Sequence, residues 1–574
     1  MRQIFLLFLL IPLTLLGQPL ITKYEQSNGK QSPTYAEIID WWKKMDAASP
    51  YVSMKAMGQT DAGFPLHLVL VSWSKDFDIA SLKKKNKTII LVNNGIHPGE
   101  PDGIDASMLL VKELINPRHH LPENVVLAII PVYNIGGALN RSPFYRVDQD
   151  GPEEFGFRGN AQNLDLNRDF IKCDSKNALS FAEIFHLLDP DIFIDNHVSN
   201  GADYQHVMTL LTTQHNKLGG AMGHYLENTF EPAIYATMKN MGWDLIPYVN
   251  HFGGPPASGW NQFWDSPRYS SGYTTLFNCF GFTPETHMLK PYPQRVAVTR
   301  DLMKSFIGYA EKNGTEIRKL RAAAKKEQSV AESFPIAWKR DTTQKREFLF
   351  KGYAAGKKPS EISGLPRLYY DRSKPFEKTM TLYTGFVDTL SVRRPEAYII
   401  PQGWWKVIDR LKANQVKMRR FQKDTIVEVE VYTIVKYQSG QRPFEGHHLN
   451  TNVQVSSTKK KINFRKGDYF IPMNQAANRF IIQVLEPHAE DSYFAWNFFD
   501  PILGQKEGYS DYAFEDTAFE YLSKNPALKK QLDERKAKDS VFAQSAGAQL
   551  NFIYQHSPWM EPAYMQYPVY RLVR

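Results

Sequence analysis

A histidine and a glutamate stand three residues apart, at His97 and Glu100, in the stretch NNGIHPGEPDG. The apolar, β-branched run just before it, TIILV at 88–92, predicts a buried strand, so the pair lies on a turn at a strand end. Such turns often carry catalytic or binding residues. Imidazole and carboxylate together could bind a metal ion, although a lone H-x-x-E also occurs in solvated turns. Further polar clusters are needed to support a metal site.

Three other polar clusters follow apolar runs or lie in the loops after them. They are NLDLNRDF at 163–170, DIFIDNHVSN, which places His197 at a strand end, and GFTPETHMLK, which carries Glu285. Each is common in surface loops when it occurs alone. Together they belong to one unit of alternating strands and helices, and the carboxyl ends of parallel strands meet at one edge of a sheet. The joint pattern therefore predicts one site at that edge.

These residue types suit a catalytic zinc site. Such a site takes three protein ligands and leaves a fourth position to water, and His97, Glu100 and His197 supply that set. Zinc lowers the pKa of its water to roughly 7, and a nearby carboxylate can then take the proton and pass it to a leaving amine. Glu285 is the candidate for that carboxylate. We expect one Zn²⁺ per chain.

Two arginines and an aspartate are candidates for supporting roles. A developing oxyanion needs a fixed cation besides the metal, and Arg158, shortly before the D-L-N-R stretch, is the candidate. Arg168 offers a planar fork that suits a bidentate grip on a carboxylate. Asp165 could orient a ligand histidine, because such histidines usually donate their other N–H to an acceptor.

The chain has 574 residues, which is enough for more than one domain. From about residue 18 to 328, strand-like and helix-like segments alternate, which predicts an α/β domain with a mostly parallel central sheet. The stretch SVAESFPIAWKRDTTQ at 329–344 is interpreted as a linker. Beyond it, strand-like runs such as DTIVEVEVYTIVKYQ, a short helix and a charged helical tail predict a β-rich α+β region at 340–574.

The first residues, MRQIFLLFLLIPLTLLGQPL, predict a secretory signal peptide at 1–17. That run is too short for a typical transmembrane helix and no other stretch is apolar enough, so we expect an exported chain, periplasmic or secreted, without a transmembrane segment. The net charge of +9 is spread along the chain, which argues against a nucleic-acid partner. Only Cys173 and Cys279 are present, which excludes a disulfide framework, whether the two pair or stay buried thiols.

The ordered set of motifs resembles the carboxypeptidase A family of zinc carboxypeptidases. The order is H-x-x-E, an arginine, D-x-N-R, one histidine and a late glutamate, within about residues 22–330. The resemblance implies that family's fold, with a mixed, mostly parallel sheet and helices on both faces. It also implies roles for individual residues: His97, Glu100 and His197 as zinc ligands, Arg158 polarising the carbonyl, Asn167 and Arg168 binding the substrate's terminal carboxylate, Glu285 as general base and acid, and Asp165 beside a ligand histidine. The region at 340–574 is similar to C-terminal extensions of exported bacterial members.

Two details depart from a simple match to the family. A tyrosine that closes over the substrate is usual before the catalytic glutamate, but the spacings of Tyr269 and Tyr273 single out neither, so neither is assigned to the site. Arg141 and Arg146 precede Arg158 in the same part of the chain. Arg158 is preferred because its spacing to the D-L-N-R stretch matches some branches of the family.

The sequence therefore predicts an exported zinc-dependent carboxypeptidase that releases C-terminal residues from peptides or proteins. Two alternatives stay open. Related hydrolases with the same zinc pattern cleave acyl-amino acids or cell-wall peptides, and Arg168 would then bind an amino-acid or diaminopimelate carboxylate. A degenerate member could instead bind peptides or glycans without catalysis, through the aromatic-rich C-terminal region. The preferred C-terminal residue and the oligomeric state are not predicted.

Overall fold

A computed structural model describes residues 20–116, 122–256 and 258–573. Its central sheet contains β1 (Val52–Gln59), β2 (Pro65–Ser72), β3 (Thr88–Asn93), β4 (Val125–Ile130), β7 (Ile192–Asp195), β8 (His197–Ser199), β9 (Met208–Thr212), β10 (Ile246–Pro247) and β12 (Phe280–His287). The order is β1-β2-β4-β3-β7-β12-β9-β10, with β8 paired to β12. β4, β3, β7 and β12 pair in parallel, whereas β1, β2 and β9 each form antiparallel pairs. The expected mixed α/β sheet is confirmed.

Helices cover both faces of this sheet. One face carries α2 (Tyr35–Ala48), α4 (Asp102–Leu114), α9 (Glu231–Asn240) and α11 (Tyr292–Val330), and the other carries α6 (Lys176–Leu188) and α10 (Ser270–Thr275). Along β3, Ile90 and Val92 pack with the first set, and Ile89 and Leu91 pack with the second. Side chains of a strand alternate between its two faces, so a strand between two helix layers is apolar at every position. This explains the buried run that precedes His97.

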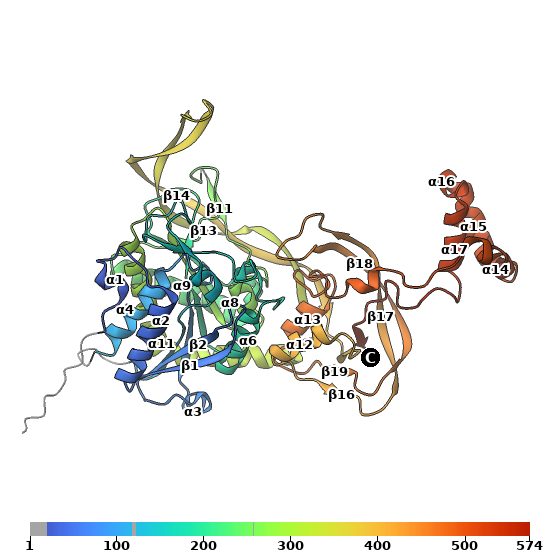
Figure 1. The fold of residues 1–574 in the computed structure, drawn as a ribbon, viewed down its shortest axis with the longest axis horizontal. Coiled ribbons are helices and arrows are strands. Elements are labelled where there is room, and N and C mark those ends of the chain that lie inside the picture. The colour runs from blue at the N-terminus through green and yellow to red at the C-terminus, as the bar shows by residue number, and fades with distance from the viewer. Residues whose placement is uncertain (1–19, 117–121, 257, 574) are drawn as a thin grey trace, which may run out of the picture.

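The interpretation of residues 329–344 as a linker is wrong. α11 continues to Val330, and β13 (Ser333–Pro359) then pairs with β14 (Pro366–Arg393) in a long antiparallel hairpin. Phe334 and Ile336 are buried at alternate positions, which is the two-residue period of a strand. The hairpin projects at the top of Figure 1. Near the middle of its length β14 also pairs in parallel with β11 (Gly259–Asn261), so the hairpin is bonded to the preceding part of the chain.

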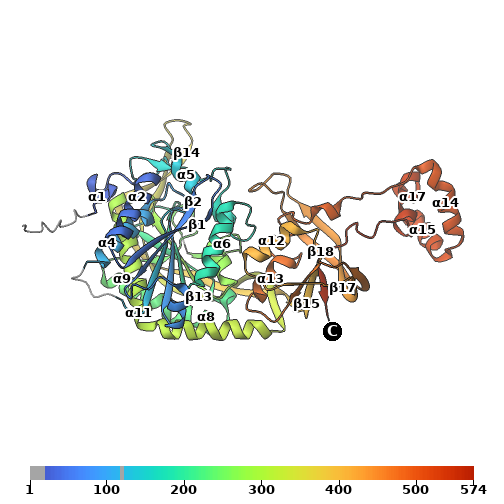
Figure 2. The same cartoon turned by 60° about the horizontal axis from the view of Figure 1, so that its bottom comes forward.

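The C-terminal region is rich in β-structure, as expected. Its six-stranded sheet consists of β16 (Arg419–Arg420), β19 (Tyr469–Pro472), β15 (Ala397–Ile400), β20 (Tyr570–Leu572), β17 (Thr425–Ser439) and β18 (Asn450–Phe464), in that order. α12 (Trp405–Ala413) and α13 (Asn478–Leu485) lie between this sheet and the first unit (Figure 2). The helices α14 (Asp511–Ser523), α15 (Pro526–Lys538), α16 (Ser540–Ala543) and α17 (Ala546–Gln555) project beyond it around a small core of their own.

The two regions share one continuous hydrophobic core. The Phe277 ring, which follows α10, lies 5.2 Å from the Phe480 ring of α13. The hydroxyl group of Tyr273 in α10 donates to Asn414, just after α12, at 2.7 Å. The C-terminal region is therefore packed directly against the α6 face of the central sheet.

Two further predictions concern the termini and the thiols. The predicted signal peptide at 1–17 lies outside the described residues. In the described part of the chain, no helix combines the length and the apolarity that crossing a bilayer requires. Cys173 and Cys279 are both buried, unpaired thiols.

Candidate active site

Two histidines and one glutamate face one another at the carboxyl ends of neighbouring strands. His97 Nδ1 lies 3.2 Å from Glu100 Oε1, and His197 Nδ1 lies 3.1 Å from Glu100 Oε2. One potential ligand atom from each of the three side chains lies within 4.8 Å of the others. All three side chains are buried. The residues that the sequence groups as one ligand set therefore lie together.

The other ring nitrogen of each histidine faces a carboxylate. His97 Nε2 lies 3.0 Å from Asp165 Oδ1, and His197 Nε2 lies 3.1 Å from Asp195 Oδ2. With the proton on Nε2, each Nδ1 lone pair points toward Glu100. Metal-binding histidines usually have such an acceptor, which fixes the tautomer and the orientation of the ring. Catalytic zinc takes three ligands of these N and O types, so this donor set fits zinc.

The turn that carries His97 and Glu100 is held tightly between β3 and α4. The backbone N–H of Glu100 donates to the carbonyl oxygen of His97 at 2.8 Å. Gly103 lies at the start of α4, where a Cβ atom would stand 2.4 Å from Asn94 Oδ1 and 2.5 Å from the Cβ atom of Asn196. Only glycine allows this close approach, which brings α4 against the ends of β3 and β7. The position of Glu100 therefore follows from the packing of the helix.

Nearby charges keep Glu100 ionised. Arg146 Nη1 donates to Glu100 Oε1 at 2.8 Å. Burial alone raises the pKa of Glu100, but Arg146 and His97 outweigh it and hold this pKa well below its usual range. Burial lowers the pKa of His197, whereas Asp195 and Glu100 together raise it well above its usual value. A lowered pKa favours the carboxylate form of Glu100, which is the form that binds a cation.

A cavity of about 650 Å³ opens onto the cluster. This volume is typical of ligand-binding pockets. Of the residues singled out from the sequence, all but Asp165 line it, namely His97, Glu100, Arg158, Asn167, Arg168, His197 and Glu285. Asp165 bonds to His97 from outside the cavity lining.

Arg158 is fixed by an ion pair. Its Nε and Nη2 atoms donate to Asp165 Oδ2 at 3.0 and 2.8 Å, and its Nη1 atom lies 3.8 Å from Glu100 Oε1. The guanidinium group therefore stands at the edge of the cluster with one nitrogen turned toward it. Arg141, by contrast, donates to the carbonyl oxygen of Ser32 and does not line the cavity.

Asn167 and Arg168 offer a polar surface to an anion. They lie in η1 (Leu166–Arg168), a short turn capped by Asp165, whose Oδ1 accepts from the backbone N–H of Asn167 at 2.9 Å. The Arg168 guanidinium stacks on the Tyr269 ring, 4.6 Å from its centroid. Its Nη1 atom donates to the carbonyl oxygen of Asn167 at 2.8 Å, and the nearest carboxylate oxygen, on Asp165, is 3.9 Å away. Its Nη2 atom has no acceptor among the described residues, so this side of the fork is open to a ligand.

Glu285 lies in β12 and is paired in register with His197 of β8. Burial, with repulsion from Glu100 and Asp195, raises the pKa of Glu285 to about 8, although His197 opposes the rise. Among the described residues its carboxylate has no hydrogen-bond partner, which leaves it free to exchange a proton with a molecule in the cavity. A dication bound nearby would lower this pKa.

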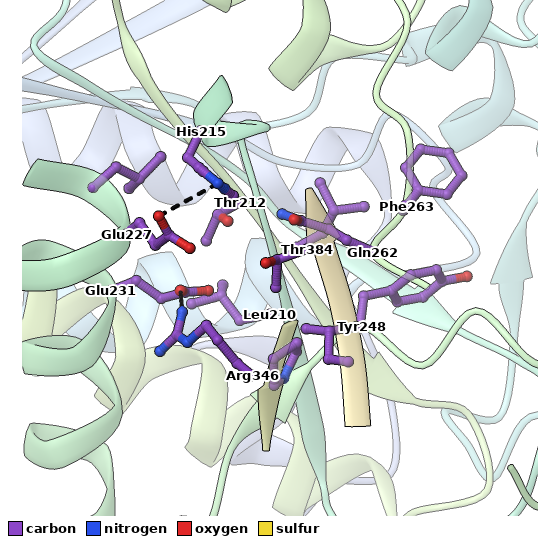
Figure 3. Close-up of a pocket in the computed structure, with 14 residues that line it drawn as sticks. Leu210, Thr212, His215, Glu227, Glu231, Tyr248, Gln262, Phe263, Arg346 and Thr384 are labelled. Carbon is purple, nitrogen blue, oxygen red and sulfur yellow. Dashed lines mark hydrogen bonds and ion pairs between the residues drawn. The ribbon is translucent and has the colours of Figure 1, made fainter. Parts of the chain in front are cut away.

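A second, smaller pocket, whose lining is drawn in Figure 3, adjoins the cavity. It measures about 20 Å³, which is room for about one water molecule, and it shares three lining residues with the cavity: Leu211, Tyr248 and Phe263. His215 Nε2 lies 3.4 Å from Glu227 Oε2, and Arg346 Nη1 lies 2.7 Å from Glu231 Oε2. Arg346 belongs to β13, so the long hairpin supports this wall. The pocket is too small for a substrate.

Three residues of the site were missed by sequence reasoning. Asp195, the last residue of β7, stands two positions before His197, the first residue of β8, and the two-residue period of extended chain is a usable signal for a histidine partner. Arg146 reaches Glu100 from a loop without regular structure, where spacing predicts nothing. Tyr269 and Tyr273 could not be told apart by spacing, but Tyr269 lines the cavity and Tyr273 is fully buried in the core.

The family model and the curated relatives that this chain matches are all described as carboxypeptidases. Residues 38–190 match the family model described as zinc carboxypeptidase, a segment that includes the H-x-x-E and D-L-N-R motifs and ends before His197 and Glu285. Carboxypeptidase 2 of Trichophyton equinum is 21% identical over 490 residues, covering 81% of this chain and 84% of that protein, and Carboxypeptidase 2 of Trichophyton rubrum is 20% identical over 494 residues. Alignments of this length extend past residue 330, beyond the span of the resemblance seen in the sequence.

Solved structures with similar chains include two carboxypeptidases. A putative carboxypeptidase A from Shewanella denitrificans has a TM-score of 0.37 and 17% identity, covering 48% of this chain and 69% of that one. The carboxypeptidase A from Helicoverpa armigera has a TM-score of 0.38 and 14% identity, covering 49% and 74%. Residues 38–190 thus resemble a zinc carboxypeptidase domain, and the family match and the curated relatives together support a peptide hydrolase.

Proposed function

We propose that this protein is an exported, zinc-dependent carboxypeptidase that releases single residues from the C-termini of peptides. One observation carries the proposal: a His₂Glu donor set and an open arginine fork line the same cavity. His97, Glu100 and His197 would hold one zinc ion per chain. A carboxylate-binding fork beside a metal site suits cleavage next to a free C-terminus.

The surrounding side chains supply the remaining chemistry. Zinc bound there would polarise a carbonyl oxygen and make a neighbouring water molecule more acidic. Glu285 would take that water's proton and then pass it to the departing amine. Arg158, held by Asp165, would stabilise negative charge on the carbonyl oxygen. Asp165 and Asp195 would keep the two imidazoles in one tautomer.

Arg168→Lys is expected to lower kcat/KM for free-acid peptides by about 10²-fold, mainly through KM. An ammonium group cannot form two parallel bonds to a carboxylate or keep the planar stacking on Tyr269. Steady-state kinetics on a peptide and on its C-terminal amide measure the effect, and the amide should change little because it offers no carboxylate. Arg340→Lys, at an exposed position of β13, is the matched control. An unchanged KM for Arg168→Lys would contradict the role.

The experiment that tests the function itself combines metal analysis with a panel of short peptides. We expect about one zinc per mature chain and release of a single C-terminal residue that a chelator abolishes and added zinc restores. One zinc per chain with no cleavage of any peptide, but with hydrolysis of N-acyl amino acids or cell-wall peptides, would overturn the proposal in favour of that alternative. The family match and the curated relatives, all named carboxypeptidases, favour the peptidase over that alternative and over a non-catalytic binding protein.

The proposal extends to the organisation of the chain. We propose that a signal peptide at 1–17 exports it and that residues 22–330 carry the catalytic groups. Residues 340–574 would then form a distinct β-rich region. The bacterial origin expected from that C-terminal extension stays a prediction.

A further inference from the structure

We propose that the C-terminal region completes the active site, and that Glu445 is a positioning residue for the loop that carries Asn167 and Arg168. This inference rests on the proposed carboxypeptidase function. Glu445 Oε2 accepts a hydrogen bond from the backbone N–H of Asp165 at 2.7 Å. The two residues are 280 positions apart, so only the folded C-terminal region brings them together.

The hydrogen bond from Glu445 lies at Asp165, the residue that caps η1. Asp165 caps the turn that presents Asn167 and Arg168, and its side chain also bonds to His97 and Arg158. Fixing the backbone at Asp165 therefore fixes the origin from which the carboxylate-binding side chains project. A hydrogen bond to a charged acceptor is stronger than one between neutral groups, so it suits this task.

The conformation of Glu445 indicates that its side chain has a use. Phe444 and His447 exchange backbone hydrogen bonds of 2.7 and 3.1 Å, and the two residues between them, Glu445 and Gly446, have φ values of +50° and +82°. Such a two-residue turn strongly favours Asn-Gly or Asp-Gly, and a glutamate at positive φ is uncommon. Asparagine would suit this backbone better but is one methylene shorter. The longer side chain is the one that reaches Asp165.

The same segment is anchored a second time, beyond the carboxylate loop. His447 Nε2 lies 2.6 Å from Asp174 Oδ2, and Arg410 of α12 donates to Asp174 Oδ1 at 2.9 Å. Burial raises the pKa of Asp174, but His447 and Lys172 outweigh it and hold this pKa below its usual range. The C-terminal region therefore holds the chain at both ends of the stretch from 165 to 174.

A second contact supports the other half of the carboxylate surface. Asp491 accepts from the backbone N–H of Arg268 at 3.0 Å and pairs with its guanidinium at 2.6 Å. The Trp264 indole N–H donates to Glu490 at 2.7 Å. The residue after Arg268 is Tyr269, whose ring stacks on Arg168. The C-terminal region therefore contacts both the turn that carries Arg168 and the residue next to Tyr269, on which Arg168 stacks.

Three variants of the full-length chain separate positioning from stability. Glu445→Asn improves the turn but shortens the side chain, so it should fold at least as well as the wild type. Glu445→Gln keeps an acceptor oxygen at the same reach and should recover much of the function. Glu428→Asn, at an exposed position of β17, is the matched control.

Two measurements are made on each variant. Steady-state kinetics compare a free-acid peptide with its C-terminal amide, and hydrogen–deuterium exchange follows the segment 163–170 in the resting enzyme. For Glu445→Asn we expect KM for the free acid to rise about tenfold, kcat to change much less, and exchange in 163–170 to accelerate at unchanged Tm. Glu445→Gln should fall close to the wild type, and Glu428→Asn should match it.

Hydrogen–deuterium exchange and KM of the Glu445 variants test the role of Glu445, whereas peptide cleavage by the wild type tests the proposed function. Unchanged exchange in Glu445→Asn would show that Glu445 does not hold the loop, which overturns the inference. Faster exchange with an unchanged KM and an unchanged acid-to-amide ratio would overturn it too, because the contact would then be structural only. A wild-type enzyme that cleaves no peptide would overturn the proposed function, even where the exchange data still show Glu445 holding the loop.

Discussion

Glu285→Gln is expected to leave zinc bound and to lower kcat on a free-acid peptide by about 10³-fold. Glutamine has nearly the same shape but cannot accept a proton from water or return it to the leaving amine. Glu285 does not belong to the His₂Glu cluster, and its carboxylate has no hydrogen-bond partner among the described residues, so the substitution breaks no bond that holds the fold. Turnover should therefore fall while metal content and Tm stay at the wild-type values.

The control for Glu285→Gln is a substitution of a carboxylate in the same domain that does not line the cavity. Glu183→Gln in α6 serves, because that side chain is exposed on the domain surface. Measured together, zinc content, Tm and kcat separate lost chemistry from lost structure. A Glu285→Gln enzyme with near-normal kcat would refute the assignment of the proton-transferring group to Glu285.

The sequence carried enough information to predict the catalytic half of the fold and the ligand cluster. β3 is buried at every position and apolar from 89 to 92 because helices cover both faces of the sheet, and that continuous run is typical of a central strand. Parallel strands bring their carboxyl ends together, so His97 and His197, which follow two such strands, were predicted to meet. Both inferences depend only on short-range pattern and on sheet topology.

Contacts made by loops and by long-range packing could not be predicted in the same way. Arg146 contacts Glu100 from a loop, and Glu445 contacts Asp165, which is 280 positions away in the sequence. No periodic pattern in the sequence predicts either contact. Residues 329–344 are interpreted as a linker from the sequence, whereas β13 begins at Ser333 within them. Pairing with β14 overrode that local signal, as tertiary contacts commonly do for β-structure.

His197→Ala is expected to remove most of the bound zinc and, with it, nearly all peptidase activity. The variant loses one of three ligands and also leaves the Asp195 carboxylate without its imidazole partner, so an uncompensated buried charge adds to the loss. Metal analysis after dialysis, together with kcat at rising zinc concentration, measures both effects. We expect zinc content well below one per chain and partial recovery of activity only at high added zinc.

His197→Ala and Glu285→Gln should differ in metal content. Both variants should be nearly inactive, but only His197→Ala should be metal-poor, because only His197 belongs to the cluster whose ligand atoms lie within 4.8 Å of one another. His224→Ala, at an exposed position of α8 (Gly220–Tyr225), should keep both zinc and activity. A His197→Ala enzyme that retains a full complement of zinc would remove His197 from the ligand set. The proposed geometry would then have to be rebuilt around Glu100 and His97 alone, with another donor from the cavity wall.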